Sequence, residues 1–338
     1  MTNLIEVKDL SVQFSGPKMG LFRKKSAPIH AVDGVSLNIR KGEALGLVGE
    51  SGSGKTTFGR ALLRLIEPNS GVVHMNGNDG RKNITELDAK NLRKAWLNMQ
   101  MVFQDPDSSL NPRMTVMDTI AESLLVNRIA KNIREAKARV VEVAESCGLT
   151  VEQLSRYPHA FSGGQRQRIS IARALVTKPE FIICDEPVSA LDVSIQAQIL
   201  NLLIELQEEM DLTLLFISHD LIVVAYICDR IAVMYLGNII EIAPTKDLFN
   251  KPLHPYTEAL MSAIPSDDPD QQLSESVLAG EATGVAGERK GCLFAPRCRY
   301  ADGDKCSEIK PVLKDFGDGR MAACHYAETL TLTGFEDL

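Results

Sequence analysis

A glycine-rich stretch that starts at Gly49 carries the clearest chemical signal in the chain. Residues 49–56 read GESGSGKT and fit the pattern GxxxxGK[ST], between an apolar segment and one with helical periodicity. Glycines let a backbone curl so that its N–H groups surround phosphate oxygens, and the following helix adds the positive end of its dipole. The stretch predicts a phosphate-binding loop in which Lys55 reaches the β- and γ-phosphates and Thr56 ligates Mg²⁺. A flexible turn is the plain alternative.

Two adjacent carboxylates, Asp185 and Glu186, follow the apolar stretch Phe181–Cys184. Such a strand places Asp185 at its C-terminal edge, where the carboxylate can hold Mg²⁺ or its water. Glu186 is then the candidate base for an attacking water. An acidic pair after a strand is commonplace alone, but a phosphate-binding loop some 130 residues upstream favours this chemical role.

The segments around these residues alternate between strands and helices. Glu43–Val48 reads as a short apolar strand, and Thr213–Ile217, like Phe181–Cys184, is apolar and β-branched as buried parallel strands are. Lys55–Ile66 has helical periodicity. The alternation predicts a doubly wound α/β core.

Further elements are expected around this core. Leu4–Phe14 and Ala31–Ile39 read as partner strands, separated by a basic surface loop with Lys18, Arg23, Lys24 and Lys25. A helical block between Gln104 and Phe181 reads as an inserted subdomain, with expected helices at Val116–Ile129, Ile133–Cys147 and Gly163–Val176. Residues Ser266–Gly287 are rich in Asp, Ser and Gly and read as a linker.

Composition narrows the class of protein. The chain has 338 residues, enough for about two folding units, and its 44% hydrophobic and 24% charged residues exclude a disordered or fibrous chain. A net charge of -7 argues against a general nucleic-acid coat. The N-terminus lacks a signal peptide, and the longest apolar runs, Leu221–Cys228 and Ile231–Leu236, fall short of the roughly 18 residues of a membrane span. Any membrane role is therefore expected to come through a partner.

The segment Phe161–Arg168, FSGGQRQR, resembles the signature motif of ATP-binding cassette (ABC) ATPases. It lies upstream of the Asp185–Glu186 pair, as that family requires. Gln104 in VFQDP matches the family's Q-loop, Asp192 in SALD matches the D-loop, and His219 in SHD matches the switch histidine. The resemblance covers roughly residues 4–245. It implies an α/β fold: a P-loop NTPase core with an antiparallel β-subdomain and an inserted α-helical subdomain, at residues 1–250 with the helices at about 105–179.

The resemblance also implies roles for single residues. ATP and Mg²⁺ are the expected ligands, with Glu186, His219 and Gln104 catalytic and with Thr56, Gln104 and Asp185 at the metal. Residues 162–165 would form a second anion site at a helix N-terminus, facing the ATP of a neighbouring chain. Phe14 matches the aromatic that stacks on adenine, with Phe22 and His30 as rivals. The expected nucleotide contacts are Phe14, Gly49, Glu50, Ser51, Gly52, Ser53, Gly54, Lys55, Thr56, Thr57, Gln104, Ser162, Gly163, Gly164, Gln165, Asp185 and Asp192.

Three of these residues have a simpler interpretation. Ser162 could be a plain helix N-cap, and His219 could be an ordinary loop residue. An aromatic residue in a strand, such as Phe14, more often belongs to a core.

Residues 251–338 resemble the C-terminal extension of ATPase subunits of oligopeptide/dipeptide importers, through His254–Thr257 and Gly291–Cys298. This implies peptide uptake, a second ATPase subunit (identical or paralogous), two transmembrane permease subunits, and indirect contact with a solute-binding protein. It also implies a peripheral place on the cytoplasmic face of the cell membrane. Relatives carry nickel, glutathione or sugars, so the sequence leaves the solute open.

Four cysteines crowd this extension, separated by 5, 7 and 17 residues. Without an export signal, a metal site is expected before disulfides. The paired knuckles of zinc ribbons are missing, and a [4Fe–4S] cluster needs four cysteines and tolerates varied spacing. The family resemblance favours such a cluster in a structural role, with zinc or no metal as alternatives. The expected ligands are Cys292, Cys298, Cys306 and Cys324, with His325 as a possible substitute.

Two rival functions are compatible with a nucleotide site. A soluble ABC protein that acts on DNA or ribosomes commonly has two cassettes or long basic segments, whereas this chain has one cassette and an acidic balance. A regulatory module that senses ATP without hydrolysis would not need Asp185, Glu186 and His219. The sequence therefore favours the transporter ATPase, with no nucleic-acid partner.

Overall fold

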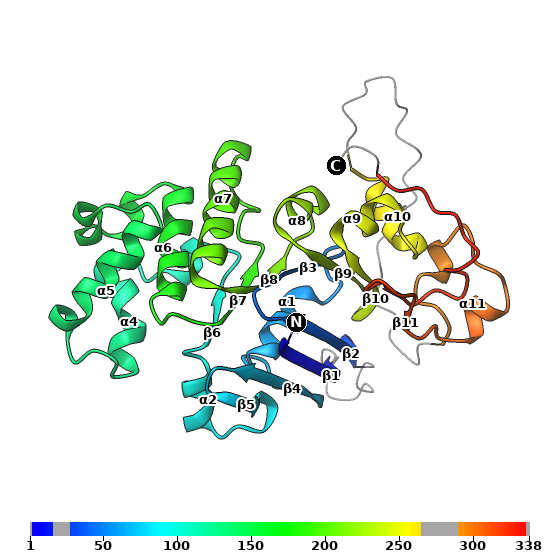
Figure 1. The fold of residues 1–338 in the computed structure, drawn as a ribbon, viewed down its shortest axis with the longest axis horizontal. Helices are drawn as coiled ribbons and strands as arrows, with labels where there is room; N and C mark the ends of the chain where they lie inside the picture. The colour runs from blue at the N-terminus through cyan, green and yellow to red at the C-terminus, as the bar shows by residue number, and fades with distance from the viewer. Residues whose placement is uncertain (1, 16–27, 265–289, 336–338) are drawn as a thin grey trace, which may run out of the picture. The chain divides into compact units, whose positions relative to one another are not determined.

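The computed structural model (Figure 1) describes residues 2–15, 28–264 and 290–335. Its chain divides into two compact units. Phe22, the basic loop around Lys18 and the linker Ser266–Gly287 lie outside the described residues. The first unit comprises Met1–Ile5, Ile39–Glu43 and Met75–Ile217. The second unit comprises Glu6–Asn38, Ala44–His74 and Ser218–Leu338.

Three parallel strands form the sheet of the first unit. They are β6 (Met99–Val102), β7 (Phe181–Asp185) and β8 (Thr213–Ile217), with β7 in the middle. Every residue of β7 and β8 is buried, which explains their unbroken apolar sequences. The long helix α7 (Val193–Met210) leads from β7 to β8, so the two predicted strands are confirmed together with a helical crossover.

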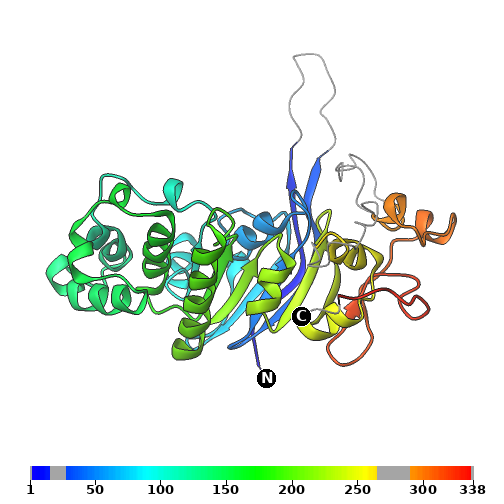
Figure 2. The same cartoon turned by 90° about the horizontal axis from the view of Figure 1, so that it is seen from above.

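Several helices of the first unit lie between β6 and β7, within Met75–Ile217. Helix α4 (Val116–Val126) packs against α5 (Ile133–Ser146) and α6 (Gly163–Leu175), and Figures 1 and 2 show the three side by side. Their starts agree with the sequence-based expectation, and each has a capping side chain before its first residue: Thr115, Asn132 and Ser162. The unit also contains the short helices α2 (Ala89–Ala95) and α3 (Pro106–Ser109) and strand β5 (Gly80–Asn83).

The second unit is built on strand β3 (Ala44–Val48), which pairs in parallel with β9 (Arg230–Tyr235). Strand β9 turns back antiparallel into β10 (Asn238–Pro244). A distant C-terminal segment then adds two short antiparallel strands, β12 (Met321–Ala322) beside β10 and β11 (Lys314–Asp315) beside β12. The helices of this unit are α1 (Lys55–Leu62), α8 (Leu221–Ile227), α9 (Thr245–Asn250), α10 (Pro255–Met261) and α11 (Lys305–Glu308).

Most of β1 (Asn3–Phe14), β2 (Ile29–Arg40) and β4 (Ser70–Gly77) also belongs to the second unit, where the strands are adjacent in the order β2-β1-β4. Strands β1 and β2 match the expected pair, whereas β4 was not predicted from the sequence. None of the helices within the three described stretches combines the length and apolar composition that a membrane span requires.

A buried carboxylate fastens α10 to the sheet. Glu241 on β10 is fully buried and accepts hydrogen bonds from the backbone of Leu253 (2.7 Å) and His254 (2.9 Å) and from the Thr257 hydroxyl (2.6 Å). Burial raises the pKa of Glu241 to about 7, although these hydrogen bonds act to lower it. The three donors hold the start of α10, and thereby Tyr256, in a fixed place.

Candidate functional site

The phosphate-binding loop lies between β3 and α1, and its shape depends on glycines. Gly49, Gly52 and Gly54 have φ angles of +151°, +79° and +107°, a region that favours glycine. A Cβ atom on Gly49 would lie 2.1 Å from the Met234 carbonyl oxygen, and one on Gly54 would lie 2.1 Å from that of Ala31. The backbone therefore passes too close to its neighbours for any side chain at these two positions.

Lys55 is buried at the centre of this loop. Its ammonium donates to the carbonyl oxygens of Gly49 (2.7 Å) and Glu50 (2.9 Å), with the Ser53 hydroxyl at 3.4 Å. The other expected loop contacts range from the buried Ser53 to the exposed Ser51 and Gly52. A cation surrounded by loop carbonyls and preceding a helix is suited to receive phosphate oxygens.

Two residues that touch this loop were missed by sequence reasoning. The Tyr256 hydroxyl accepts a hydrogen bond from the Glu50 backbone N–H at 2.9 Å, and Arg297 forms an ion pair with the Glu50 carboxylate at 3.1 Å. Tyr256 was noticed only as part of a family resemblance, and no local signal relates Arg297 to a loop 247 residues away.

In the first unit, the structure brings Gln104 and Glu186 together. The Gln104 side-chain amide donates to Glu186 Oε2 at 2.8 Å. Glu186 has a φ of +47°, unusual for a residue other than glycine, and its N–H donates to Ile217 O on β8 at 3.0 Å. A backbone strained in this way at the end of a buried strand is typical of a functional site. Asp185, one residue earlier, has no exposed surface.

The segment Ser162–Gln165 forms the N-terminus of α6 in the first unit. Ser162 caps the helix: its hydroxyl accepts from the Gln165 N–H at 3.4 Å, and its own N–H donates to the Gln165 side chain at 3.1 Å. The simpler interpretation of Ser162 as an N-cap is therefore confirmed, and it leaves the expected role toward a neighbouring chain as a prediction. Gly164 must be glycine, because its Cβ would lie 2.3 Å from Ile195 on α7.

The remaining predicted contact residues lie at or next to the ends of helices and strands. Asp192 caps α7 by accepting from the Ile195 N–H (3.0 Å) and the Ser194 hydroxyl (2.7 Å). The Ser194 hydrogen bond, and then that from Ile195, lowers the pKa of Asp192. His219 is exposed just after β8, and Phe14 ends β1 with 41% of its surface exposed. An aromatic side chain this exposed is not part of the core, which agrees with its predicted stacking role without testing it.

The four C-terminal cysteines and His325 line one small cavity of about 20 Å³ in the second unit. Burial raises the pKa of Cys292 and of Cys298, and burial together with the neighbouring thiols raises the pKa of Cys324 to about 12. The cavity has room for about one water molecule, far less than a [4Fe–4S] cluster needs.

The expected cluster site is therefore not formed in this geometry, although the four cysteines lie around one cavity. Among the residues that the structure describes, no group of three or more His, Cys, Asp or Glu side chains is arranged to hold a metal ion. The sequence prediction was right that the four cysteines converge. The four converging side chains do not form a set of metal ligands. Spacing along the chain specifies neither the distances between the sulfur atoms nor the space among them.

Comparison with known proteins finds a family match in each of two separate parts of the sequence. A family profile described as ABC transporter matches residues 32–189, and one described as oligopeptide/dipeptide transporter, C-terminal region, matches residues 240–306. The oligopeptide transport ATP-binding protein OppF of Bacillus subtilis is 54% identical over 271 residues, covering 80% of this chain and 85% of that protein. A putative peptide import ATP-binding protein of Brucella ovis is 49% identical over 303 residues, covering 90% of this chain and 94% of that protein.

Solved structures agree at the level of the fold. A dimeric ATP-binding cassette in a post-hydrolysis state, bound to ADP and Pi, has a TM-score of 0.61 and 30% identity and covers 71% of this chain and 98% of that one. The cbiO1 protein of Clostridium perfringens, part of an ABC transporter complex, has a TM-score of 0.62 and 27% identity and covers 74% and 91%. The predicted α/β fold of an ATP-binding cassette is confirmed.

Replacing Gly54 by alanine should distort the loop, because the new Cβ would clash with the Ala31 carbonyl. Gly52→Ala is a matched control, since Gly52 also has a positive φ but nothing lies within 4 Å of its Cβ. We expect Gly52→Ala to cost about 1–2 kcal/mol of unfolding free energy. Gly54→Ala should cost more and abolish nucleoside triphosphate binding, as measured by urea unfolding and calorimetry. Equal stability and affinity in the two variants would contradict this description of the loop.

Proposed function

This chain belongs to the ATP-binding proteins of ABC transporters, in the group that carries the oligopeptide/dipeptide C-terminal region, and we propose that it hydrolyses MgATP to drive peptide uptake across the cytoplasmic membrane. The observation that carries the proposal is the glycine-framed loop with Lys55 buried at its centre. The names of its relatives, which describe peptide import, support the substrate class.

Lys55 and the loop N–H groups are proposed to bind the triphosphate, with Thr57 beside them. Thr56, Asp185 and Gln104 are the proposed ligands of Mg²⁺, a hard cation suited to hydroxyl, carboxylate and amide oxygens. When bound, Mg²⁺ neutralises phosphate charge. These residues would act mainly through positioning and electrostatics, because phosphoryl transfer requires little covalent work from the protein.

Glu186 is proposed to orient the attacking water and accept its proton. Its carboxylate is held by the Gln104 amide at 2.8 Å, and the same amide is a proposed metal contact. A change in the coordination of Mg²⁺ would therefore affect the position of Glu186 through the Gln104 side chain. His219, which follows β8 directly, is proposed to contact the γ-phosphate, and Phe14 is proposed to stack on the adenine.

A second cassette, identical or paralogous, is proposed to complete each site. The N–H groups at the start of α6, from Ser162 to Gln165, would meet the ATP held by the partner's loop, with Asp192 nearby in the sequence of family motifs. The dimeric state of the cassette structure bound to ADP and Pi supports this arrangement. The helices of residues 105–179 would contact two transmembrane permease subunits, which places the chain at the cytoplasmic face of the membrane. A solute-binding protein would act on it only indirectly.

The cassette is proposed to span residues 1–250 and the extension residues 251–338. A C-terminal family match at residues 240–306 supports a distinct segment toward this end of the chain. Within the extension, we propose a structural [4Fe–4S] cluster on Cys292, Cys298, Cys306 and Cys324, supported by their convergence on one cavity. Binding would require the cavity to open and the thiols to lose their protons.

Anaerobically purified full-length chain should then contain four iron and four sulfide per chain, measured by metal and acid-labile sulfide analysis. Stoichiometric zinc without sulfide, or a chain free of metal, would contradict the cluster and leave the ATPase proposal untouched.

Glu186→Gln should lower ATP turnover by about 10²–10⁴-fold, because it removes the general base, while leaving MgATP affinity within two-fold of wild type. Steady-state phosphate release by the assembled transporter and calorimetry on the full-length chain measure the two quantities. Glu67→Gln is a suitable control, since Glu67 forms a surface ion pair with Arg64 and lies outside both the phosphate-binding loop and the helices of residues 105–179. Undiminished turnover in Glu186→Gln would remove Glu186 from this role, and a wild-type chain that binds MgATP without hydrolysis would favour the regulatory alternative.

A further inference from the structure

The C-terminal extension contacts the phosphate-binding loop at Glu50. Tyr256, on α10, accepts the Glu50 N–H at 2.9 Å through its hydroxyl. Arg297, at the end of the short 3₁₀ turn Ala295–Arg297, places one guanidinium nitrogen 3.1 Å from each oxygen of the Glu50 carboxylate. One backbone group and one side-chain group of the same loop residue are therefore held by two segments of the extension.

These contacts are sheltered from water. Tyr256 is fully buried, and the side chains of Arg297 and Glu50 are 12% and 23% exposed. An ion pair in this setting is screened by solvent less than a surface pair. Partial burial lowers the pKa of Arg297, but hydrogen bonds to Tyr235 and Glu50 outweigh it and leave the pKa raised, so the side chain is charged.

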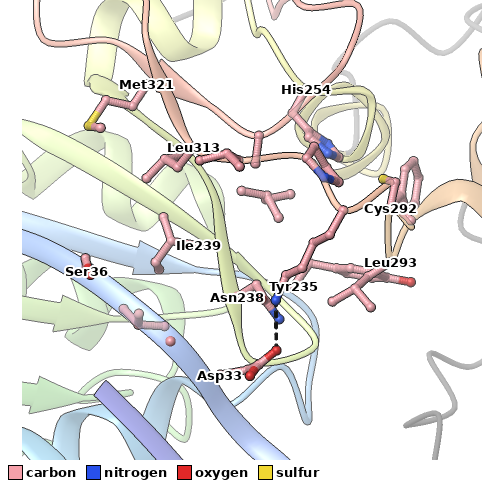
Figure 3. Close-up of a pocket in the computed structure, with 18 of the residues that line it drawn as sticks. Asp33, Ser36, Tyr235, Asn238, Ile239, His254, Cys292, Leu293, Leu313 and Met321 are labelled. Carbon is pink, nitrogen blue, oxygen red and sulfur yellow. Dashed lines mark hydrogen bonds and ion pairs between the residues drawn. The ribbon is translucent and has the colours of Figure 1, made fainter. Parts of the chain in front are cut away.

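An aromatic cluster keeps both groups in place. The rings of Tyr235 and Tyr256 lie 4.6 Å apart, and Phe294 packs edge-on to both, at 5.5 Å and 5.4 Å. Figure 3 shows Tyr235 at the end of β9 lining the same cavity, of about 480 Å³, as His254 and Cys292. Tyr256 is thus fixed by this packing and by the Glu241 anchor at the start of α10. Arg297 also donates to the Tyr235 hydroxyl at 3.4 Å.

The contacts at Glu50 bear directly on Lys55. The carbonyls of Gly49 and Glu50 accept from the Lys55 ammonium at 2.7 Å and 2.9 Å, and the Glu50 N–H belongs to the peptide group that contains the Gly49 carbonyl. Tyr256 therefore holds one side of this peptide group while Lys55 occupies the other. Fixing it reduces the conformational freedom that the loop would lose when phosphate binds.

Arg297 affects the phosphate-binding loop through its charge. Glu50 is an acidic residue inside a loop suited to polyphosphate, and an unpaired carboxylate there would repel the ligand. Arg297 neutralises it at 3.1 Å. We propose that the extension tunes the nucleotide site of the proposed function through two residues, with Tyr256 positioning the loop backbone and Arg297 cancelling the charge of Glu50.

The test measures binding of the magnesium complex of a non-hydrolysable ATP analogue to the full-length chain by calorimetry. Arg297→Met should raise Kd about ten-fold and Tyr256→Phe about three- to five-fold, in line with a charged and a neutral hydrogen bond. Adding Glu50→Gln to Arg297→Met should restore Kd to within three-fold of wild type. Rescue of this kind would not follow from a purely structural role.

Arg299→Met and Tyr300→Phe are matched controls. Arg299 forms an ion pair with Glu258 at 2.9 Å, and the Tyr300 hydroxyl contacts the same carboxylate, so both variants perturb the extension without touching the loop. Both should leave Kd unchanged. In the assembled transporter, Tyr256→Phe should raise KM for ATP by the same factor as Kd and leave kcat within two-fold.

Two kinds of failure remain distinguishable. If the wild-type chain does not bind the analogue, or binds it as well as Lys55→Ala does, the proposed function itself fails. If wild type binds and Lys55→Ala does not, while Arg297→Met and Tyr256→Phe match wild type or Glu50→Gln gives no rescue, only the proposed tuning is overturned. Should Arg297→Met fail to fold, Arg297→Lys, which keeps the charge, must bind within three-fold of wild type.

Discussion

A polyphosphate can be held only where backbone N–H groups converge and side chains leave room for it, and the rest of this structure depends on meeting that constraint. The loop between β3 and α1 meets it because Gly49 and Gly54 pass so close to the carbonyls of Met234 and Ala31 that no Cβ fits. The parallel pairing of β3 with β9 sets the position of Met234. Lys55 then occupies the centre of the loop with its charge directed at two carbonyls.

In the first unit, one hydrogen bond between an amide and a carboxylate joins the proposed metal ligand Gln104 to the proposed base Glu186. Strands β6 and β7 are adjacent and parallel, so the residues that follow them come out at the same edge of the sheet. The extension has a comparable relation to the loop of the second unit, through Glu50. Glu186 and Glu50 are thus each held by a partner from a separate segment of the chain.

Local patterns made much of this predictable. The starts of α4 and α5 were predicted because apolar periodicity begins at Val116 and Ile133, and that of α6 because Ser162 reads as a helix N-cap. Strands β7 and β8 were predicted because their sequences are apolar, as in strands buried on both faces. What stayed hidden depends on distant segments: β10 is completed by Met321–Ala322, and Glu50 meets Arg297 across 247 residues. Neither pairing leaves a periodicity in its own segment. The four cysteines were predicted as metal ligands; they line one cavity, but among the described residues they are not arranged to hold a metal ion.

The most consequential proposal is that one copy of this chain contains the parts of a reaction centre but not their working arrangement, because the start of α6 is proposed to meet ATP held by another cassette. Specific ATPase activity measured over a wide range of chain concentrations tests it most directly. Activity per chain should fall toward zero once dilution separates the cassettes, and it should return on concentration. An activity per chain that stays constant down to concentrations at which light scattering finds only monomers would contradict the account.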